Sequence, residues 1–285
     1  SWSSGSDIFV QGTFDIQEDA AQSLNSDNTI NTYSDFTLNG TLDLGTQGNA
    51  YVEGDFGISS TGEVIIGGGD FHVDSDGYYT HLINGEFKQS GGLFESNKAI
   101  IFEENASTIV SGGTIKVAAF SAPNASTFEP TGGTVEISRT QGGLGFVTAI
   151  NGNYLHNLTI NSPTGGSMLY NDIIIQNELK VLMGEMNLNT HAATVNGDVT
   201  INAQLFMQNA GNVMNAGSSG DNQILFGASA NLNYLEQGTI NVIGDCIIEN
   251  GASGNMASNH RLIFVGSDDQ NLINNSETTL GTIEL

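Results

Sequence analysis

The chain has 285 residues, of which 31 are acidic and only six are Lys or Arg, so its formal net charge at pH 7 is −25. A surface this anionic repels phosphate backbones, which excludes nucleic acid as a partner, and it disfavours binding to anionic membranes. No apolar run approaches the roughly 18 residues of a membrane-spanning helix, so we expect no direct membrane insertion. The single cysteine, Cys246, cannot form an internal disulfide and lies in an apolar, strand-like segment.

Residues 1–34 lack a regular pattern, and we expect an irregular N-terminal coil or cap there. The segment 17–24 is too short and too polar to predict more than a single helical turn. From residue 36 onward, apolar and polar residues alternate with a period of two, which is typical of half-buried strands. This alternation favours an ordered chain, although hydrophobic residues make up only 38% of the sequence.

Three strand-like patterns recur in the same order through residues 36–137. The first follows glycines that are 21, 23, 21 and 20 residues apart, namely Gly48, Gly69, Gly92, Gly113 and Gly133. The second begins at Gly40, Gly62, Gly85, Ala106 and Ala125. The third is looser and runs through Phe36, Phe56, Tyr79 and Ile100.

These repeats predict an all-β fold, a right-handed parallel β-helix (β-solenoid) with three short strands per coil of about 21 residues. Each strand is expected to pair with its copies one coil earlier and one coil later. Leu42, Val64 and Phe87 then fall in one interior column, and outward Asn, Thr and Ser side chains can form ladders along the stack. A meandering β-sandwich is the alternative fold.

The second half of the chain keeps this pattern with less regular lengths. Residues 177–181 predict a strand with a copy 20 residues later at 197–201, and further strands are expected at 223–226, 238–242, 245–248 and 262–265. No linker separates the halves, so we expect a single continuous solenoid over residues 1–285. Because Leu285 ends inside an apparent strand, we expect a segment of a longer chain, or ends covered by further coils or a capping partner.

Two stretches, 133–161 and 262–285, share one module, and the first contains the phrase YLHNLTI at residues 154–160. Together with the strands that follow at 179–181, 185–189 and 191–199, this phrase resembles the repetitive β-helical surface and adhesin-like proteins of the Bacteroidetes group. The resemblance implies a secreted, extracellular protein at the bacterial cell surface, of the kind often exported by the type IX secretion route. It also implies a structural, adhesin-like role with glycan or other cell-surface contacts.

Many parallel β-helix proteins degrade pectin or other polysaccharides, and an enzyme of this kind is the alternative to a structural role. A lyase needs clustered Lys or Arg, and a hydrolase needs paired carboxylates at a defined separation. The six basic residues are scattered, and the nearest imitation of a site is Asp268-Asp269 beside His260 and Arg261, in a segment that reads as a turn. We therefore expect a non-catalytic protein without catalytic residues; polysaccharide binding or degradation is the alternative function.

Asp74 and Asp76 imitate part of a calcium-binding loop in the segment 74–77. A complete EF-hand would need acidic ligands where this chain has His72 and Ile83. The two aspartates are therefore a candidate Ca²⁺ pair, with a simple corner turn as the alternative. No other cofactor is expected.

Tyr78 and Tyr79 follow this segment and are the candidate glycan-binding residues, because exposed aromatic rings can stack on sugars. The five histidines are scattered through the chain. We expect His72 and His81 to lie on a strand surface without binding a metal.

Overall fold

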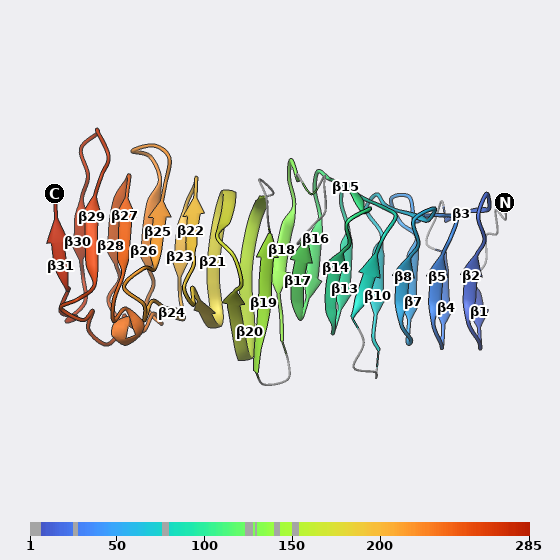
Figure 1. The fold of residues 1–285 in the computed structure, drawn as a ribbon, viewed down its shortest axis with the longest axis horizontal. Coiled ribbons are helices and arrows are strands. Elements are labelled where there is room, and N and C mark those ends of the chain that lie inside the picture. The colour runs from blue at the N-terminus through green and yellow to red at the C-terminus, as the bar shows by residue number, and fades with distance from the viewer. Residues whose placement is uncertain are drawn as a thin grey trace. The chain divides into compact units, whose positions relative to one another are not determined.

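The computed structural model of the chain describes residues 7–24, 28–75, 80–122, 128, 130–139, 143–149 and 154–285. Apart from one 3-10 helix, η1 (Leu232–Tyr234), the regular elements among these residues are β-strands. The strands pair in parallel with copies roughly one repeat away, as Ala50 does with Phe71, so the predicted β-solenoid is confirmed (Figure 1). The chain divides into two compact units: unit 1 is Ser1–Glu136 with Ile150–Asn153, and unit 2 is Ile137–Ala149 with Tyr154–Leu285.

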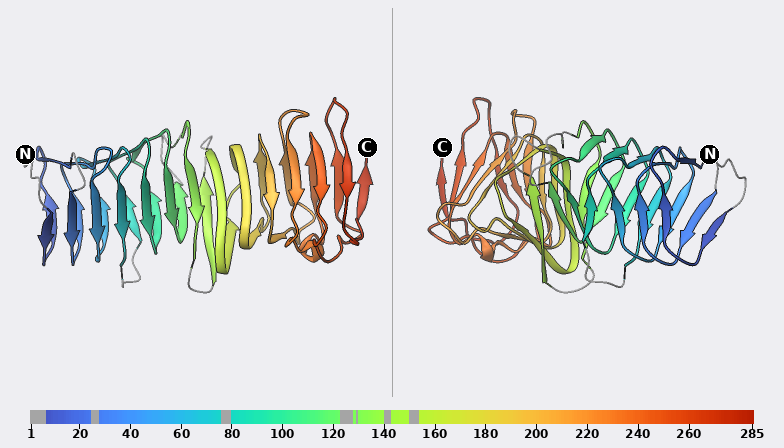
Figure 2. Two further views of the ribbon diagram at one scale, coloured as in Figure 1. Left: turned by 180° about the vertical axis from the view of Figure 1, so that it is seen from behind. Right: turned by 45° about the vertical axis from the view of Figure 1, so that its right-hand side comes forward.

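The strands of unit 1 form three columns, A, B and C, and Figure 2 shows the strands of a column lying side by side. Column A contains β1 (Ile8–Val10), β4 (Thr29–Thr32), β7 (Asn49–Val52), β10 (Asp70–Val73), β13 (Leu93–Ser96), β16 (Thr114–Val117) and β18 (Thr134–Ile137). Column B contains β2 (Phe14–Ile16), β5 (Phe36–Leu38), β8 (Phe56–Ile58), β11 (His81–Ile83), β14 (Ala99–Phe102) and β17 (Ala119–Ala122). Column C contains β3 (Ala21–Ser23), β6 (Thr41–Asp43), β9 (Glu63–Ile66), β12 (Glu86–Gln89) and β15 (Ser107–Val110).

Columns A and C correspond to the first and second sequence patterns. In column C, Leu42 is the register partner of Val64, and Val64 is the partner of Phe87. All three side chains are fully buried, so the predicted interior column is confirmed. Burial of each such side chain stabilises the folded state by about 1.5–3 kcal/mol.

The prediction from the third sequence pattern is wrong at one position. In column B the register places His81 between Phe56 and Ile100, because Leu82 pairs with Gly57 and His81 pairs with Ile100. Tyr79, which the sequence favoured there, lies outside the described residues. A buried imidazole is tolerated at this position because both of its nitrogens have hydrogen-bond partners, which are given below.

The glycines of the first pattern are required by the close stacking of coils. Gly92 has a φ of +64°, and a Cβ built on it would lie 2.0 Å from the carbonyl oxygen of Gly69 in the preceding coil. Gly113 repeats this conformation one coil later, with a φ of +78°. A side chain at either position would therefore strain the backbone and collide with the neighbouring coil.

The N-terminal residues form a more regular coil than the sequence predicts for residues 1–34. Ile8 pairs in register with Ile30, and Phe14 pairs with Phe36. The segment 17–24 contains a hydrogen-bonded turn, in which the N–H of Ala20 donates to the carbonyl oxygen of Gln17 at 3.0 Å, and the turn leads directly into β3. Pairing with the next coil supplies the order that the local sequence does not predict.

Phenylalanine rings dominate the interior of unit 1. The ring centroids of Phe56 and Phe71 lie 4.6 Å apart, and those of Phe71 and Phe94 lie 5.5 Å apart with the planes at 84°. Phe87 meets Phe94 in the same edge-to-face manner at 5.6 Å. Such arrangements are the favoured geometry for buried aromatic pairs.

Unit 2 begins with long strands that pass through the corners of the coil, namely β19 (Gly143–Ala149), β20 (Leu155–Leu169) and β21 (Ile173–Asn187). Along its length β21 pairs in turn with β22 (Ala192–Val195), β23 (Val199–Ile201) and β24 (Gln204–Phe206), so one strand covers three sides of a coil. The predicted pairing of 177–181 with 197–201 is confirmed, since Leu179 is the partner of Val199.

The later coils of unit 2 form two regular columns. Column D contains β22, β25 (Val213–Ala216), β27 (Thr239–Val242), β29 (Arg261–Phe264) and β31 (Thr282–Glu284), and column E contains β23, β26 (Gln223–Phe226), β28 (Asp245–Ile248) and β30 (Leu272–Asn274). On the third side of these coils, isolated bridges join Gln204 of β24 to Asn231 and Met207 to Leu235. Asn231 and Leu235 flank η1. Cys246 is fully buried in β28, and burial raises the pKa of its thiol to about 12.

The corner between columns D and E varies in length. The segments that join the strands there are 196–198, 217–222, 243–244 and 265–271. Despite this variation the register of both columns is maintained. In column E, Val199 pairs with Ile224 and Ile224 with Cys246. In column D, Met214 pairs with Ile240 and Ile240 with Leu262.

Candidate functional site

Polar side chains at the corners of the coils bond to the backbone of the neighbouring coil. In each case a side-chain oxygen accepts a hydrogen bond from a backbone N–H that is 20 to 26 residues away in sequence. We call these contacts inter-coil caps. Examples are Asp7 with Thr29 at 3.0 Å, Asn49 with Asp70 at 3.0 Å, Asp172 with Ala192 at 2.8 Å, Asp198 with Gln223 at 3.0 Å and Asp245 with Asn271 at 2.8 Å. A carboxylate used in this way accepts charge-assisted bonds that hold the stack together.

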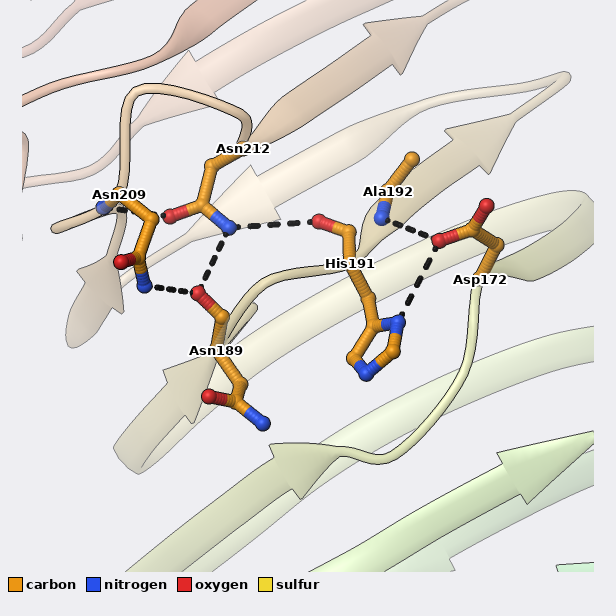
Figure 3. Close-up of polar contacts among 6 residues, drawn as sticks. All are labelled: Asp172, Asn189, His191, Ala192, Asn209 and Asn212. Atoms are coloured by element: carbon orange, nitrogen blue, oxygen red, sulfur yellow. Dashed lines mark hydrogen bonds and ion pairs between the residues drawn. The ribbon is translucent and has the colours of Figure 1, made fainter.

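At one corner of unit 2, an asparagine side chain bonds to several backbone groups (Figure 3). The fully buried amide of Asn212 donates from Nδ2 to the carbonyl oxygens of Asn189 at 3.0 Å and His191 at 3.4 Å. Its Oδ1 accepts from the backbone N–H of Asn209 at 3.0 Å. Asn189 has a φ of +53°, which asparagine tolerates better than most residues. This corner is a closed polar network with a structural role.

The predicted outer ladder is present on column D. Asn215 Nδ2 donates to Thr194 Oγ1 at 3.0 Å, and Asn241 Nδ2 donates to Asn215 Oδ1 at 2.8 Å. The three residues are consecutive register partners on the outer face of β22, β25 and β27. Their side chains therefore bond along the stack, parallel to the backbone ladders.

Two carboxylates and a lysine meet on the outer face of column C. Lys88 Nζ lies 2.6 Å from Glu63 Oε1 and 3.0 Å from Glu86 Oε2, and Thr41 Oγ1 donates to Glu63 at 3.0 Å. The hydrogen bond from Lys88 lowers the pKa of Glu63, and the bond to Glu63 raises the pKa of Lys88. A lysine with a raised pKa stays protonated and is unsuited to act as a base, so the geometry is that of an ion-pair network.

The outer face of column A carries one ring in each of four successive coils. We call this set the ring ladder; it consists of Phe9, Tyr33, Tyr51 and His72. The three aromatic members are 65%, 51% and 43% exposed, respectively. The Tyr51 and His72 rings are stacked, with centroids 5.0 Å apart and planes 2° apart. His72 Nδ1 lies 3.1 Å from Glu95, which also pairs with Lys116 at 2.6 Å.

Tyr33 follows β4 directly, and the backbone ladder continues through it. Its N–H donates to the carbonyl oxygen of Val10 at 3.1 Å. Thr32 is buried, so strand alternation turns Tyr33 to the same outer face as Asn31. Phe9, Asn31 and Tyr51 are consecutive register partners on this face.

Two histidines are buried, which corrects the expectation that His81 lies on the surface. His81 accepts at Nδ1 from the backbone N–H of Phe56 at 3.3 Å, and its Nε2 lies 2.8 Å from Ser96 Oγ. Desolvation lowers the pKa of His81 to about 4. His260 donates from Nδ1 to the carbonyl oxygen of Gln237 at 2.9 Å, and desolvation lowers its pKa as well.

The predicted calcium pair is only partly described. Asp74 Oδ1 accepts a hydrogen bond from Asn97 Nδ2, which makes it part of a corner contact with the next coil. Asp76 lies outside the described residues, as do the candidate glycan residues Tyr78 and Tyr79. In the part of the chain that the structure describes, no group of three or more His, Cys, Asp or Glu residues could hold a metal ion.

The nearest sequence imitation of a catalytic site does not assemble. Arg261 pairs with Glu284 through two hydrogen bonds, at 2.8 Å from Nε and 2.5 Å from Nη2. His260 points inward and bonds the backbone, as given above. Asp268 and Asp269 are exposed in the segment between β29 and β30. The four residues therefore have separate structural surroundings.

The ring ladder was missed by sequence reasoning, although a signal was present. Tyr51 and His72 occupy the same position in successive copies of the first pattern, so their stacking could have been read from the repeat. Phe9 and Tyr33 lie within the segment assigned to an irregular cap, where no register was available.

Comparisons with known proteins give no family assignment. The chain matches no protein-family model, no curated protein sequence and no solved structure. Over the described residues, none of the helical structure is long and apolar enough to cross a membrane.

Proposed function

We propose that the chain is a non-catalytic structural protein of the bacterial cell surface, a rigid β-helical stalk or fibre segment with adhesin-like use. The observation that carries this proposal is the series of inter-coil caps. Acidic and amide side chains that an enzyme would direct at a substrate instead bond to the backbone of the next coil, as Asp198 does to Gln223. The resemblance to secreted adhesin-like repeat proteins supports the extracellular location.

Rigidity follows from the bonding pattern within each unit. Every interior coil pairs through its backbone with the coil before and the coil after, and the caps and the Thr194–Asn215–Asn241 ladder add side-chain bonds in the same direction. Bending a unit would stretch many of these bonds together. A stalk made in this way holds whatever it carries at a fixed distance from its anchor.

Single-molecule force spectroscopy on the full chain tests the mechanical role. Coils should unfold in discrete steps, each releasing about 21 residues and lengthening the chain by roughly 70 Å. Asp198→Ala should lower the force needed in unit 2, whereas the matched variant Asp269→Ala, which removes an exposed carboxylate, should not. Extension of the chain at low force without steps would contradict the proposal.

The location and the absence of catalysis need separate experiments. An antibody against the folded protein should label intact cells of the source organism; labelling only after permeabilisation would contradict a surface role. Incubation with a panel of neutral and uronate-containing polysaccharides should release no new reducing ends. Release that is lost in Lys88→Met or Glu63→Gln would favour the polysaccharide-degrading alternative.

Polysaccharide binding is a second candidate function, and one observation favours it. The ring ladder places exposed aromatic side chains on one strand face of unit 1. Exposed rings flanked by amide and hydroxyl groups are the usual means by which proteins hold sugars.

A further inference from the structure

We propose that the outer face of column A holds a sugar ring of an uncharged glycan in a slot between Phe9 and Tyr51. The inference deepens the adhesin-like role proposed above and rests on it, because it names the face and the class of ligand. The slot is defined by three consecutive register partners: Phe9, Asn31 and Tyr51.

The two faces of the Tyr51 ring differ in their surroundings. His72 covers one face from the following coil, in a parallel stack with centroids 5.0 Å apart. The other face is directed toward the preceding coil, where the register partner is Asn31, a much shorter side chain. Tyr51 is 43% exposed, and because His72 covers the first face and Asn31 is short, we assign this exposure to the second face.

The width of the slot follows from the spacing of strands. Phe9 lies two coils before Tyr51, so at about 4.8 Å per coil the two ring positions are about 9.6 Å apart. An inserted ring makes two contacts of about 3.5–4.0 Å, one on each face, which together occupy about 7–8 Å. The remaining space suits the pucker of a saturated sugar ring and is too large for a flat aromatic group.

Polar groups surround the slot where sugar hydroxyls would lie. The amide of Asn31 forms its floor and can both donate and accept hydrogen bonds. Tyr33 follows β4 on the same face. It is 51% exposed and carries a phenolic hydroxyl that can donate and accept hydrogen bonds. A sugar held between two rings would thus also be oriented by directional bonds.

Charge restricts the class of glycan. Residues 7–75 contain no Lys or Arg but twelve carboxylates: Asp7, Asp15, Glu18, Asp19, Asp27, Asp35, Asp43, Glu53, Asp55, Glu63, Asp70 and Asp74. Uronates, sulfated sugars and other anionic glycans would be repelled by this surface. Carboxylates do accept hydrogen bonds from the hydroxyl groups of uncharged sugars.

The experiment screens the full chain against an array of uncharged, anionic and amine-bearing oligosaccharides and measures the hits by isothermal titration. At least one uncharged oligosaccharide should bind, and its affinity should change little with salt, because no ion pair is formed. Binding only to amine-bearing glycans, with an affinity that falls as salt is added, would overturn the proposal. So would the absence of any uncharged ligand.

Variants locate the site. Phe9→Ala and Tyr51→Ala should each weaken binding roughly tenfold, whereas Tyr51→Phe, which keeps the ring, should retain it. Asn31→Tyr should fill the slot and abolish binding without unfolding the protein, because it extends an existing stack. Tyr170→Ala is the matched control, since Tyr170 is 53% exposed but lies in unit 2. Unchanged binding in both alanine variants would show that the site lies elsewhere.

The result is separable from the mechanical proposal. If glycan binding fails while force spectroscopy shows stepwise unfolding, the stalk role stands and the slot is rejected. If the chain binds a glycan but extends without resistance, the slot stands and the stalk role is rejected.

Discussion

The imidazole of His81 accepts a hydrogen bond at Nδ1 from the backbone N–H of Phe56, its neighbour one coil earlier, at 3.3 Å. On the other side of the ring, Nε2 bonds to Ser96 Oγ at 2.8 Å, and Ser96 Oγ in turn accepts from the backbone N–H of Lys98. This arrangement needs a neutral imidazole, because a protonated ring would present a donor to the Phe56 N–H. The fold therefore opposes protonation of His81.

Stability should fall in mild acid because of this histidine. Its pKa is lowered by desolvation from 6.5 to about 4, so between these values the unfolded chain binds a proton that the folded chain does not. The contribution is fully present above about pH 6.5 and is lost progressively as the pH falls to about 4, for a total of about 3 kcal/mol.

The non-titrating variant His81→Gln isolates this effect, since its amide can accept from Phe56 and donate to Ser96. The melting temperature of the wild-type protein should drop more between about pH 7 and about pH 5 than that of the variant. His260 also has a lowered pKa, but it is present in both proteins and cancels in the comparison. Equal drops would show that His81 does not control acid stability.

Gly92→Ala should destabilise unit 1 by more than about 1–3 kcal/mol, because the new Cβ would be strained at φ +64° and would collide with the carbonyl oxygen of Gly69. Gly57→Ala is the control, because the nearest atom to a Cβ there is Leu82 O at 3.7 Å. Chemical denaturation of both variants measures the difference. A similar loss of unfolding free energy in both variants would show that the collision with the preceding coil does not explain the effect at position 92.

Asn212→Ala should destabilise unit 2 by about 1–3 kcal/mol, because it removes the donor to the carbonyl oxygen of His191 and the acceptor for the backbone N–H of Asn209, and leaves the carbonyl oxygen of Asn189 with Asn209 Nδ2 alone. Asn250→Ala removes the same chemical group from an exposed position and should have an effect within about 0.5 kcal/mol. The free energy of unfolding in urea provides the measurement. If the two variants are equally stable, the corner network contributes no net stability.

Lys88→Met should raise the pKa of Glu63 toward its ordinary value, because the hydrogen bond from Lys88 is the main cause of its depression. The group is partly exposed, so the cost in stability should stay below about 1 kcal/mol. An NMR titration of the Glu63 carboxyl carbon reports the shift, with Lys98→Met as the control lysine. A Glu63 pKa that stays low in Lys88→Met would exclude the ion pair in solution.

The repeat period and the alternation of apolar and polar residues predicted most of the fold. Leu42, Val64 and Phe87 could be aligned from the sequence because each lies two residues after the glycine that precedes its strand, and strand copies must stack in register. His81 could not be placed, because Tyr79, two residues earlier, is closer in size and chemistry to Phe36 and Phe56. Burial of a neutral imidazole depends on two hydrogen bonds that only the folded coil supplies.

The polar contacts were harder to predict than the core. The cap from Asp172 to Ala192 spans 20 residues, whereas the cap from Asp245 to Asn271 spans 26, so no fixed spacing reveals them. The slot between Phe9 and Tyr51 depends on which residues are consecutive on the outside of a column. That information exists only once the register of β1, β4 and β7 is known.

The corner between columns D and E accepts segments as short as 243–244 and as long as 265–271 while the strands on either side keep their partners. Sequence can therefore be inserted at this edge without disturbing the hydrogen-bonded framework. A lineage that inherits such a chain can diversify the exposed loops while conserving the scaffold, and a protein engineer can graft peptides at residues 217–222 for display at a defined position.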